Sequence, residues 1–257
     1  MTGVQMAEQS EKARAFAALH RPGEPVILYN AWDAGSAQAV AEAGAKAIAT
    51  GSASVAAAHG FKDAEALPLE LALANAARVA GAVELPVTID FEGAYAVEPE
   101  GAAANMKRLA DTGAIGCNFE DQVIGGEGLH SVEVQAGRIR AARAAVGPDF
   151  FINARTDVFL KTRATTHEPA AIEEALARSR AYAEAGASGF FVPGLVDLGQ
   201  LAQICAASPL PVNFMAFPGA PEARAVAAAG VARISHGPFP YKLAIKALKE
   251  AAEAIYG

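Results

Sequence analysis

One pattern recurs eight times in the sequence: a short apolar run, a polar or glycine-containing turn, and a segment of helical periodicity, at intervals of roughly 25 to 35 residues. The apolar runs cover residues 26–32, 47–53, 87–92, 115–121, 150–156, 189–194, 211–216 and 231–237. Glycine-containing hinges at 43–45, 112–114, 185–187 and 229–231 mark helix ends just before a strand. The repeat predicts a closed parallel (β/α)8 (TIM) barrel that takes residues 1–257 as one domain.

Composition and charge exclude several classes of protein. The chain is 53% hydrophobic and carries a net charge of −7, so it has no basic surface for nucleic acid. No apolar stretch reaches the roughly 18 residues of a membrane span, and the first residues do not resemble a secretion signal. The two cysteines, Cys117 and Cys205, form no CxxC pair. We therefore expect a cytoplasmic protein that binds neither nucleic acid nor membrane.

Catalytic groups of this fold lie at the carboxyl ends of the strands. Side chains alternate along a strand, and the apolar set faces the helices, so the polar set faces the lumen. This alternation directs Asp90, Glu92, Glu120 and Arg155, from three successive strands, toward one space. Crowded carboxylates favour a hard cation, which predicts a Mg²⁺ site, with Mn²⁺ as the alternative. The competing interpretation is that Asp90 and Glu92 begin a solvated loop and that Glu120 simply pairs with Arg155.

Other residues near the strand ends are candidates with two interpretations each. Trp32 could form a wall of the pocket or belong to the core. Asn213 shares the inward alternation and could donate to a substrate. His59 and His130 follow strands and could act as an acid or base, although a loop histidine is usually solvated. No lysine lies within a strand window, which argues against an aldolase that forms a Schiff base.

Three motifs together resemble the isocitrate lyase and phosphoenolpyruvate phosphonomutase superfamily: VTIDFEGAY (87–95), GCNFEDQ (116–122) and FFINARTDVFL (150–160). YNAWDAGSA (29–37), ATGSAS (49–54) and HGFKD (59–63) extend the resemblance over nearly the whole chain. The resemblance implies that Asp90 binds Mg²⁺ most directly. Three further acids would hold the ion largely through water: Asp63, Glu92 and Glu120.

The resemblance also implies how a substrate is bound. Gly51, Ser52 and Ala53 match the loop that binds the substrate carboxylate, and Arg155 matches the arginine that contacts the anionic end or the departing group. Glu120 and Arg155 are thus the predicted catalytic residues, and Trp32 and Asn213 are further candidates for substrate binding, as is Asp90 through the metal. Members of the superfamily exchange their last helix between subunits, and residues 241–249 have apolar side chains at helical spacing, so we expect a homodimer or homotetramer.

Two segments depart from the superfamily pattern. The Gly-Tyr-Gly turn that usually follows the acidic motif is replaced by residues 93–96, Gly-Ala-Tyr-Ala. The gating loop at residues 122–130 lacks the Lys-x-Cys-Gly-His segment of the lyases, and it also lacks the lysine and asparagine of the phosphonomutases. Cys117 cannot replace the missing thiol, because alternation directs its side chain away from the lumen.

The resulting expectation is a Mg²⁺-dependent lyase that acts on a small 2-oxo or 2-hydroxy (di)carboxylic acid through a metal-stabilised enolate. Decarboxylation of an oxaloacetate-like acid and carbon–carbon lysis both fit. The alternatives are a phosphonopyruvate-type mutase or hydrolase, a barrel aldolase or isomerase for sugar phosphates, and a degenerate barrel that only binds a metabolite.

Overall fold

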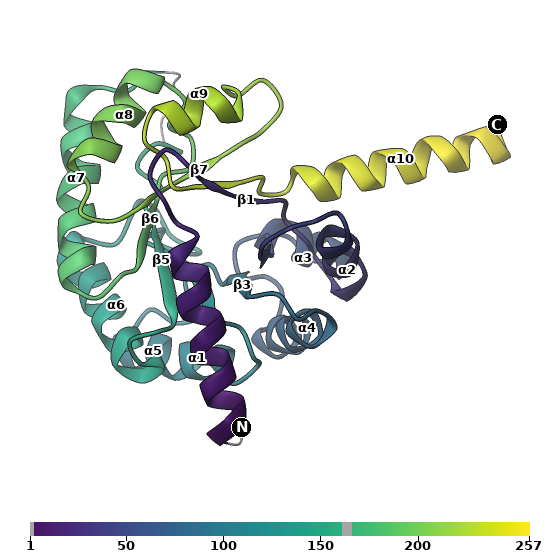
Figure 1. Cartoon of the computed structure of the whole chain (residues 1–257), viewed down its shortest axis with the longest axis horizontal. Helices are drawn as coiled ribbons and strands as arrows, with labels where there is room; N and C mark the ends of the chain where they lie inside the picture. The colour runs from purple at the N-terminus through teal and green to yellow at the C-terminus, as the bar shows by residue number, and fades with distance from the viewer. Residues whose placement is uncertain (1–2, 161–165) are drawn as a thin grey trace.

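The computed structural model describes residues 3–160 and 166–257. Within them, each of the eight predicted windows contains a parallel strand (Figure 1). The strands are β1 (Val26–Leu28), β2 (Ile48–Ala49), β3 (Val87–Asp90), β4 (Gly116–Glu120), β5 (Phe151–Arg155), β6 (Gly189–Phe191), β7 (Val212–Met215) and β8 (Arg233–Ser235). They pair in the order β1-β8-β7-β6-β5-β4-β3-β2, which confirms the predicted (β/α)8 barrel. The strands are shorter than their windows because the windows included the first residues of the following loops.

The barrel closes between β1 and β2 through a single bridge. Ala31, just after β1, pairs in parallel with Thr50, just after β2. The Ala31 amide donates to the Ala49 carbonyl at 2.8 Å, and the Gly51 amide donates to the Ala31 carbonyl. Since β2 has only two residues, these bonds complete a nearly closed barrel at its carboxyl end.

The helices of the described residues are α1 (Gly3–Ala18), α2 (Ala34–Glu42), α3 (Ser52–Ala58), α4 (Leu69–Ala82), α5 (Pro99–Ala110), α6 (Val132–Val146), α7 (Pro169–Glu184), α8 (Leu198–Ala207), α9 (Ala223–Ala228) and α10 (Phe239–Tyr256). None of them is long and apolar enough to cross a bilayer. The helix α1, which the repeat did not predict, packs Phe16 against residues at the amino ends of the strands, including Phe151 at a ring distance of 5.2 Å. This contact covers the end of the barrel opposite the predicted mouth.

The predicted alternation is confirmed in the central strands. The side chains of Ile89, Cys117, Phe119 and Ile152 are buried in the main apolar cluster, together with residues of the surrounding helices. Burying a side chain such as Phe119 contributes about 1.5–3 kcal/mol. The Cys117 thiol contacts Met106 of α5, outside the lumen. The alternating positions face inward and carry the polar groups of the site.

The last helix, α10, does not lie against its own barrel but projects away from it (Figure 1). Its side chains Leu243 and Leu248 are 60% and 66% exposed. A groove of about 440 Å³ lies beside β1 and α2, and its wall includes the exposed side chains of Ile27 and Tyr29. The chain thus presents both an apolar helix face and an apolar groove to the outside.

Candidate active site

Asp90 lies at the carboxyl end of β3, and three donors hold its carboxylate. Its Oδ2 accepts from the Ser52 amide at 2.9 Å and from the Ser52 hydroxyl at 2.8 Å. Its Oδ1 accepts from the Asn118 side-chain amide at 3.0 Å. These neutral donors orient the carboxylate and occupy three of its four lone-pair sites, which leaves one on Oδ1 for a cation.

A chain of amides lies beneath Asp90 inside the barrel. Asn153 donates to Asn118 at 2.9 Å and to Asn213 at 3.0 Å. The buried amide of Asn213 also donates to the hydroxyl of Ser235 and to backbone carbonyls of β7 and β8. Asn213 therefore faces the lumen as predicted, but its side chain is engaged in this chain of amides.

Arg233, the inward residue at the start of β8, was not among the residues predicted from the sequence. Its fully buried guanidinium donates to Asn118 Oδ1 at 3.3 Å. The two donors on Asn118 Oδ1, from Arg233 and Asn153, fix the amide so that its nitrogen points toward Asp90. The strand alternation was the signal that could have located this residue, because Ile234 packs outward.

Glu92 follows β3 and is buried, although it is an acid. Its Oε1 accepts from the backbone amide of Glu65 at 2.9 Å. Burial raises the pKa of Glu92 to about 8, and the negative charges of Asp90, Asp63 and Glu65 raise it as well. Asp63 itself is exposed on the loop between α3 and α4. The three predicted ligands Asp90, Glu92 and Asp63 thus influence one another electrostatically.

Glu120 and Arg155 lie opposite each other in the register of β4 and β5. The Arg155 guanidinium contacts Glu120 at 2.9 Å and holds both carboxylate oxygens of Asp157, at 2.6 and 3.0 Å. Burial alone would lower the pKa of Arg155, but Glu120 and Asp157 raise it above its usual value. Glu120 therefore pairs with Arg155, as the second interpretation of the sequence expected. Two of the five guanidinium N–H groups donate to Asp157, and Nη1 forms the ion pair with Glu120.

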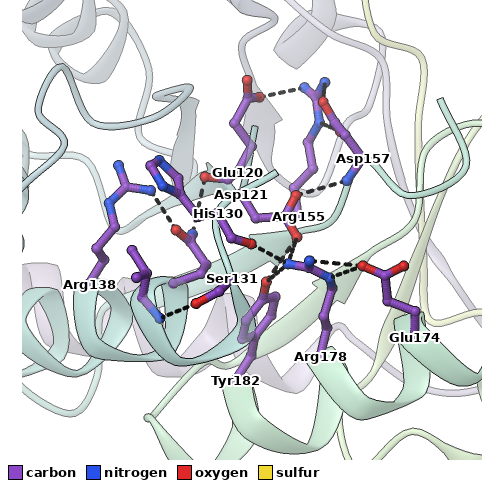
Figure 2. Close-up of polar contacts among 12 residues, drawn as sticks. Glu120, Asp121, His130, Ser131, Arg138, Arg155, Asp157, Glu174, Arg178 and Tyr182 are labelled. Atoms are coloured by element: carbon purple, nitrogen blue, oxygen red, sulfur yellow. Dashed lines mark hydrogen bonds and ion pairs between the residues drawn. The ribbon is translucent and has the colours of Figure 1, made fainter. Parts of the chain in front are cut away.

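A buried polar network behind this pair holds the base of the gating loop (Figure 2). Arg178 of α7 donates to Asp121 at 3.0 Å and to the His130 carbonyl at 2.9 Å, and Tyr182 donates to Asp121 at 2.8 Å. Asp121 in turn accepts from the backbone amide of Asp157 at 3.0 Å. The network therefore connects α7 with Asp157, whose carboxylate accepts hydrogen bonds from Arg155.

The gating loop is a compact hairpin. Gln122 and Leu129 form an antiparallel bridge, and the Val123 amide donates to the Gly128 carbonyl. The His130 amide donates to the Asp121 carbonyl at 2.8 Å. Burial lowers the pKa of His130, and the nearby charges of Arg138 and Arg178 add to this effect.

The remaining candidates lie around the mouth at β1 and β2. Gly51 and Ser52 begin α3, and the donors of Ser52 point to Asp90, while Ala53 is half-buried beside them. A Cβ on Gly51 would lie 3.2 Å from the Gly237 carbonyl, so the loops after β2 and β8 approach closely there. Trp32 joins a small apolar cluster with Val55, Ala56 and Leu67, and its ring meets that of Tyr241 edge-on at 5.2 Å.

Two histidines are tied to backbone carbonyls. The His59 ring contacts the Val55 carbonyl at the end of α3, and the His236 ring contacts the Leu28 carbonyl and packs beside Tyr29. Neither ring is directed by these contacts toward Asp90.

The described residues fit a water-rich cation site rather than a closed cage. Among them, no three His, Cys, Asp or Glu side chains converge closely enough to enclose a metal ion. Mg²⁺ usually keeps several waters and takes only one or two carboxylates from the protein. The hard oxygen donors match that preference, and a bound cation would offset the negative charges that raise the pKa of Glu92. Asp90 would be the direct ligand, with Asp63, Glu92 and Glu120 reached through water.

Comparison with known proteins decides the family. A family model described as phosphoenolpyruvate phosphomutase matches residues 16–256. The chain belongs to this family. The match confirms the resemblance drawn from the motifs and makes the chain an enzyme of a group that breaks or rearranges carbon–carbon or carbon–phosphorus bonds.

Three relatives illustrate the range of this phosphoenolpyruvate phosphomutase family. A Burkholderia cenocepacia J2315 protein, provisionally named a phosphonomutase, has a solved structure with 48% identity and a TM-score of 0.93, covering 96% of this chain and 99% of that one. An uncharacterized Mycobacterium tuberculosis protein is 34% identical over 242 residues, 94% of this chain and 88% of its own length. An oxaloacetate decarboxylase from Ectopseudomonas mendocina is 31% identical over 202 residues, 73% of this chain and 64% of its own.

Proposed function

We propose that this member of the family is a Mg²⁺-dependent lyase for a small 2-oxo or 2-hydroxy dicarboxylic acid, with oxaloacetate-like decarboxylation favoured over isocitrate cleavage. The observation that carries the proposal is the combination of the acidic residues at the mouth with a gating hairpin that has no thiol or lysine. Between Gln122 and Leu129, Glu127 is the one titratable side chain, and it is exposed.

The residues of the mouth have two roles, cation binding and binding of the anionic end of the substrate. Asp90, oriented by Ser52 and Asn118, faces the position of the cation. Mg²⁺ would supply Lewis acidity that stabilises negative charge on the oxygen next to the breaking bond. Arg155, held by Glu120 and Asp157, offers N–H groups that do not bond to Asp157 to the anionic end of the substrate.

The gating hairpin bears on the choice of reaction. Isocitrate cleavage leaves a carbanion on the succinate fragment, which needs a positioned acid, and losing such an acid typically costs about 10²-fold to 10⁴-fold in rate. Decarboxylation leaves an enolate of pyruvate that water can protonate. The similarity to an oxaloacetate decarboxylase supports the same choice.

A second candidate is carbon–phosphorus chemistry on a phosphonopyruvate-type substrate. The Burkholderia cenocepacia relative supports it, since it covers nearly the whole chain at 48% identity. The missing lysine and asparagine of the gating loop argue against it.

The decisive experiment compares oxaloacetate, isocitrate and phosphonopyruvate on one protein preparation with Mg²⁺. We expect kcat/KM for oxaloacetate to exceed that for isocitrate at least about tenfold, as the missing donor implies. Asp90→Ala should abolish both Mg²⁺ binding in calorimetry and turnover. Efficient isocitrate cleavage would contradict the choice of reaction, and unchanged Mg²⁺ affinity in Asp90→Ala would contradict the site.

We also propose that the protein forms a homodimer or homotetramer in which α10 of one subunit covers another. The exposed apolar faces of α10 and of the groove at Ile27 and Tyr29 support this arrangement.

A further inference from the structure

The turn after β3 has an unusually strained backbone. Glu92, Ala94 and Tyr95 all have positive φ angles, of 50°, 62° and 55°, although none is glycine. Ala64 and Glu65, on the loop that faces this turn, have φ angles of 69° and 57°. Such conformations cost on the order of 1–3 kcal/mol each and persist only where the surroundings enforce them. Something must therefore hold these two segments.

The carbonyl side of the turn is held by two side chains. Arg138 of α6 donates from one nitrogen to the carbonyls of Gly93 at 2.6 Å and Ala96 at 2.8 Å. Asn105 of α5 donates to the carbonyls of Ala94 at 2.9 Å and Tyr95 at 3.4 Å. All four successive carbonyls of residues 93–96 thus accept from a side chain.

Arg138 is rigidly placed for this task. It is 1% exposed, its guanidinium lies 4.7 Å over the Phe119 ring, and it also donates to Gln135. Burying a cation against backbone carbonyls is costly unless its donors are used, so its position indicates a fixed arrangement of the turn.

Glu65 holds the opposite, amide side of the turn. Its carboxylate accepts from the Tyr95 amide at 2.7 Å, and its own backbone amide donates to the Glu92 carboxylate at 2.9 Å. A Cβ at position 93 would lie 3.0 Å from the same Glu65 oxygen, so a larger residue there would push the Glu65 carboxylate away from the turn. The contacts are reciprocal: the Glu65 carboxylate binds the backbone of the turn, and the Glu65 backbone orients the carboxylate of Glu92, which belongs to that turn.

We propose that Glu65 is a positioning residue that fixes the Glu92 carboxylate toward the metal, while Asn105 and Arg138 fix the carbonyl side of the same turn. The proposal rests on the proposed function, because it assigns Glu92 to the Mg²⁺ site. It also accounts for the departure from the Gly-Tyr-Gly turn: side-chain contacts enforce at Ala94 and Tyr95 a conformation that glycine would otherwise adopt freely.

Two substitutions at Glu65 separate positioning from charge. Glu65→Gln and Glu65→Ala both remove the negative charge, but only glutamine keeps an oxygen that can accept from the Tyr95 amide. Glu70→Ala is the matched control, since Glu70 is an exposed acid of α4 that pairs with Arg108. Calorimetry with Mg²⁺ alone measures affinity, and hydrogen exchange of the peptide spanning residues 91–97 measures the order of the turn.

Loss of a group that orients a metal ligand typically weakens metal binding about 10-fold to 100-fold. We expect Glu65→Ala to weaken Mg²⁺ binding by about tenfold or more and to speed exchange in residues 92–96. The Mg²⁺ affinity of Glu65→Gln should stay within roughly threefold of that of the unsubstituted protein, a much smaller change than the one expected for Glu65→Ala. Asn105→Ala, which leaves every charge in place, should likewise speed exchange in the turn and weaken Mg²⁺ binding.

Three results would overturn the proposal. If Glu65→Ala binds Mg²⁺ as Glu70→Ala does, Glu65 does not position the ligand. If Glu65→Gln binds Mg²⁺ as weakly as Glu65→Ala does, the charge of Glu65 and not its positioning of Glu92 is responsible for the loss of affinity. If the unsubstituted protein binds no Mg²⁺, the proposed function fails together with this inference, and that failure is recognised because it precedes any substitution.

Discussion

Arg178→Met should destabilise the folded protein strongly, because it breaks a buried ion pair. Arg178 is the cation facing the fully buried carboxylate of Asp121, and its side chain is 6% exposed. The same nitrogen also donates to the His130 carbonyl and to Tyr182. Methionine fills much of the volume but leaves Asp121 with no cation in contact among the described residues.

The size of the effect follows from comparing two losses. A hydrogen bond to a charged group contributes about 1.5–3 kcal/mol, whereas breaking a buried ion pair by removing one partner typically costs about 3–5 kcal/mol. The cost of leaving the Asp121 carboxylate without a cation is the larger of the two, so we expect a loss of about 3–5 kcal/mol in the free energy of unfolding. With a urea m-value near about 3 kcal/mol/M, the midpoint should fall by roughly 1–2 M.

The assay is urea unfolding followed by circular dichroism at pH 7, at one protein concentration and without added metal. The control is Arg108→Met, which breaks the exposed contact of Arg108 with Glu70 and should cost less than about 1 kcal/mol. Asp121→Asn in the Arg178→Met background should recover much of the loss, because asparagine is neutral and still accepts from the Asp157 amide. Equal losses for Arg178→Met and Arg108→Met, or no recovery in the double variant, would refute the reasoning.

The remaining predictions concern substrate binding, assembly and pH. Arg155→Lys should raise KM and lower kcat, because lysine lacks the planar fork that holds Glu120 and Asp157 together; unchanged steady-state constants would remove Arg155 from the site. Leu248→Glu, on the exposed face of α10, should shift the sedimentation coefficient toward that of a monomer, and an unaltered oligomer would contradict the proposed packing. Burial lowers the pKa of His20 to about 3, so as pH falls the unfolded chain binds a proton that the folded chain refuses. This group should cost about 2 kcal/mol of stability between pH 6.5 and pH 5, at 1.36 kcal/mol per pH unit, and His20→Phe should remove that slope in unfolding experiments; equal slopes would contradict it.

The strands and the inward residues at their ends could be predicted because a strand has a fixed period and helices cover only one face of the barrel. That rule located Asp90, and it paired Glu120 with Arg155 on neighbouring strands that the structure joins in register. It applied equally to Arg233, which lay within the predicted strand window 231–237 but was not considered as a site residue.

The supporting contacts could not be predicted in the same way, since they join segments far apart in the chain. Arg178 lies 57 residues from Asp121, and Arg138 lies 45 residues from the Gly93 carbonyl that it binds. Arg178 and Tyr182 are four residues apart on α7, a spacing that places both on one helix face. That spacing does not indicate that Asp121 is the acid they both bind. Positive φ angles at residues such as Ala94 leave no sequence signal at all.

The two segments that depart from the superfamily pattern are both attached to α6. Arg138 of this helix binds the carbonyls at both ends of the 93–96 turn. One helical turn earlier, Gln135 donates to the Glu120 carbonyl, just before the gating hairpin begins, and Ser131 caps the helix directly after the hairpin ends. Because one helix fixes the turn that carries Glu92 and both ends of the hairpin, the mouth is organised before substrate arrives. Donors and charges fixed in this way stabilise the charge that develops during a reaction without having to reorganise at that moment.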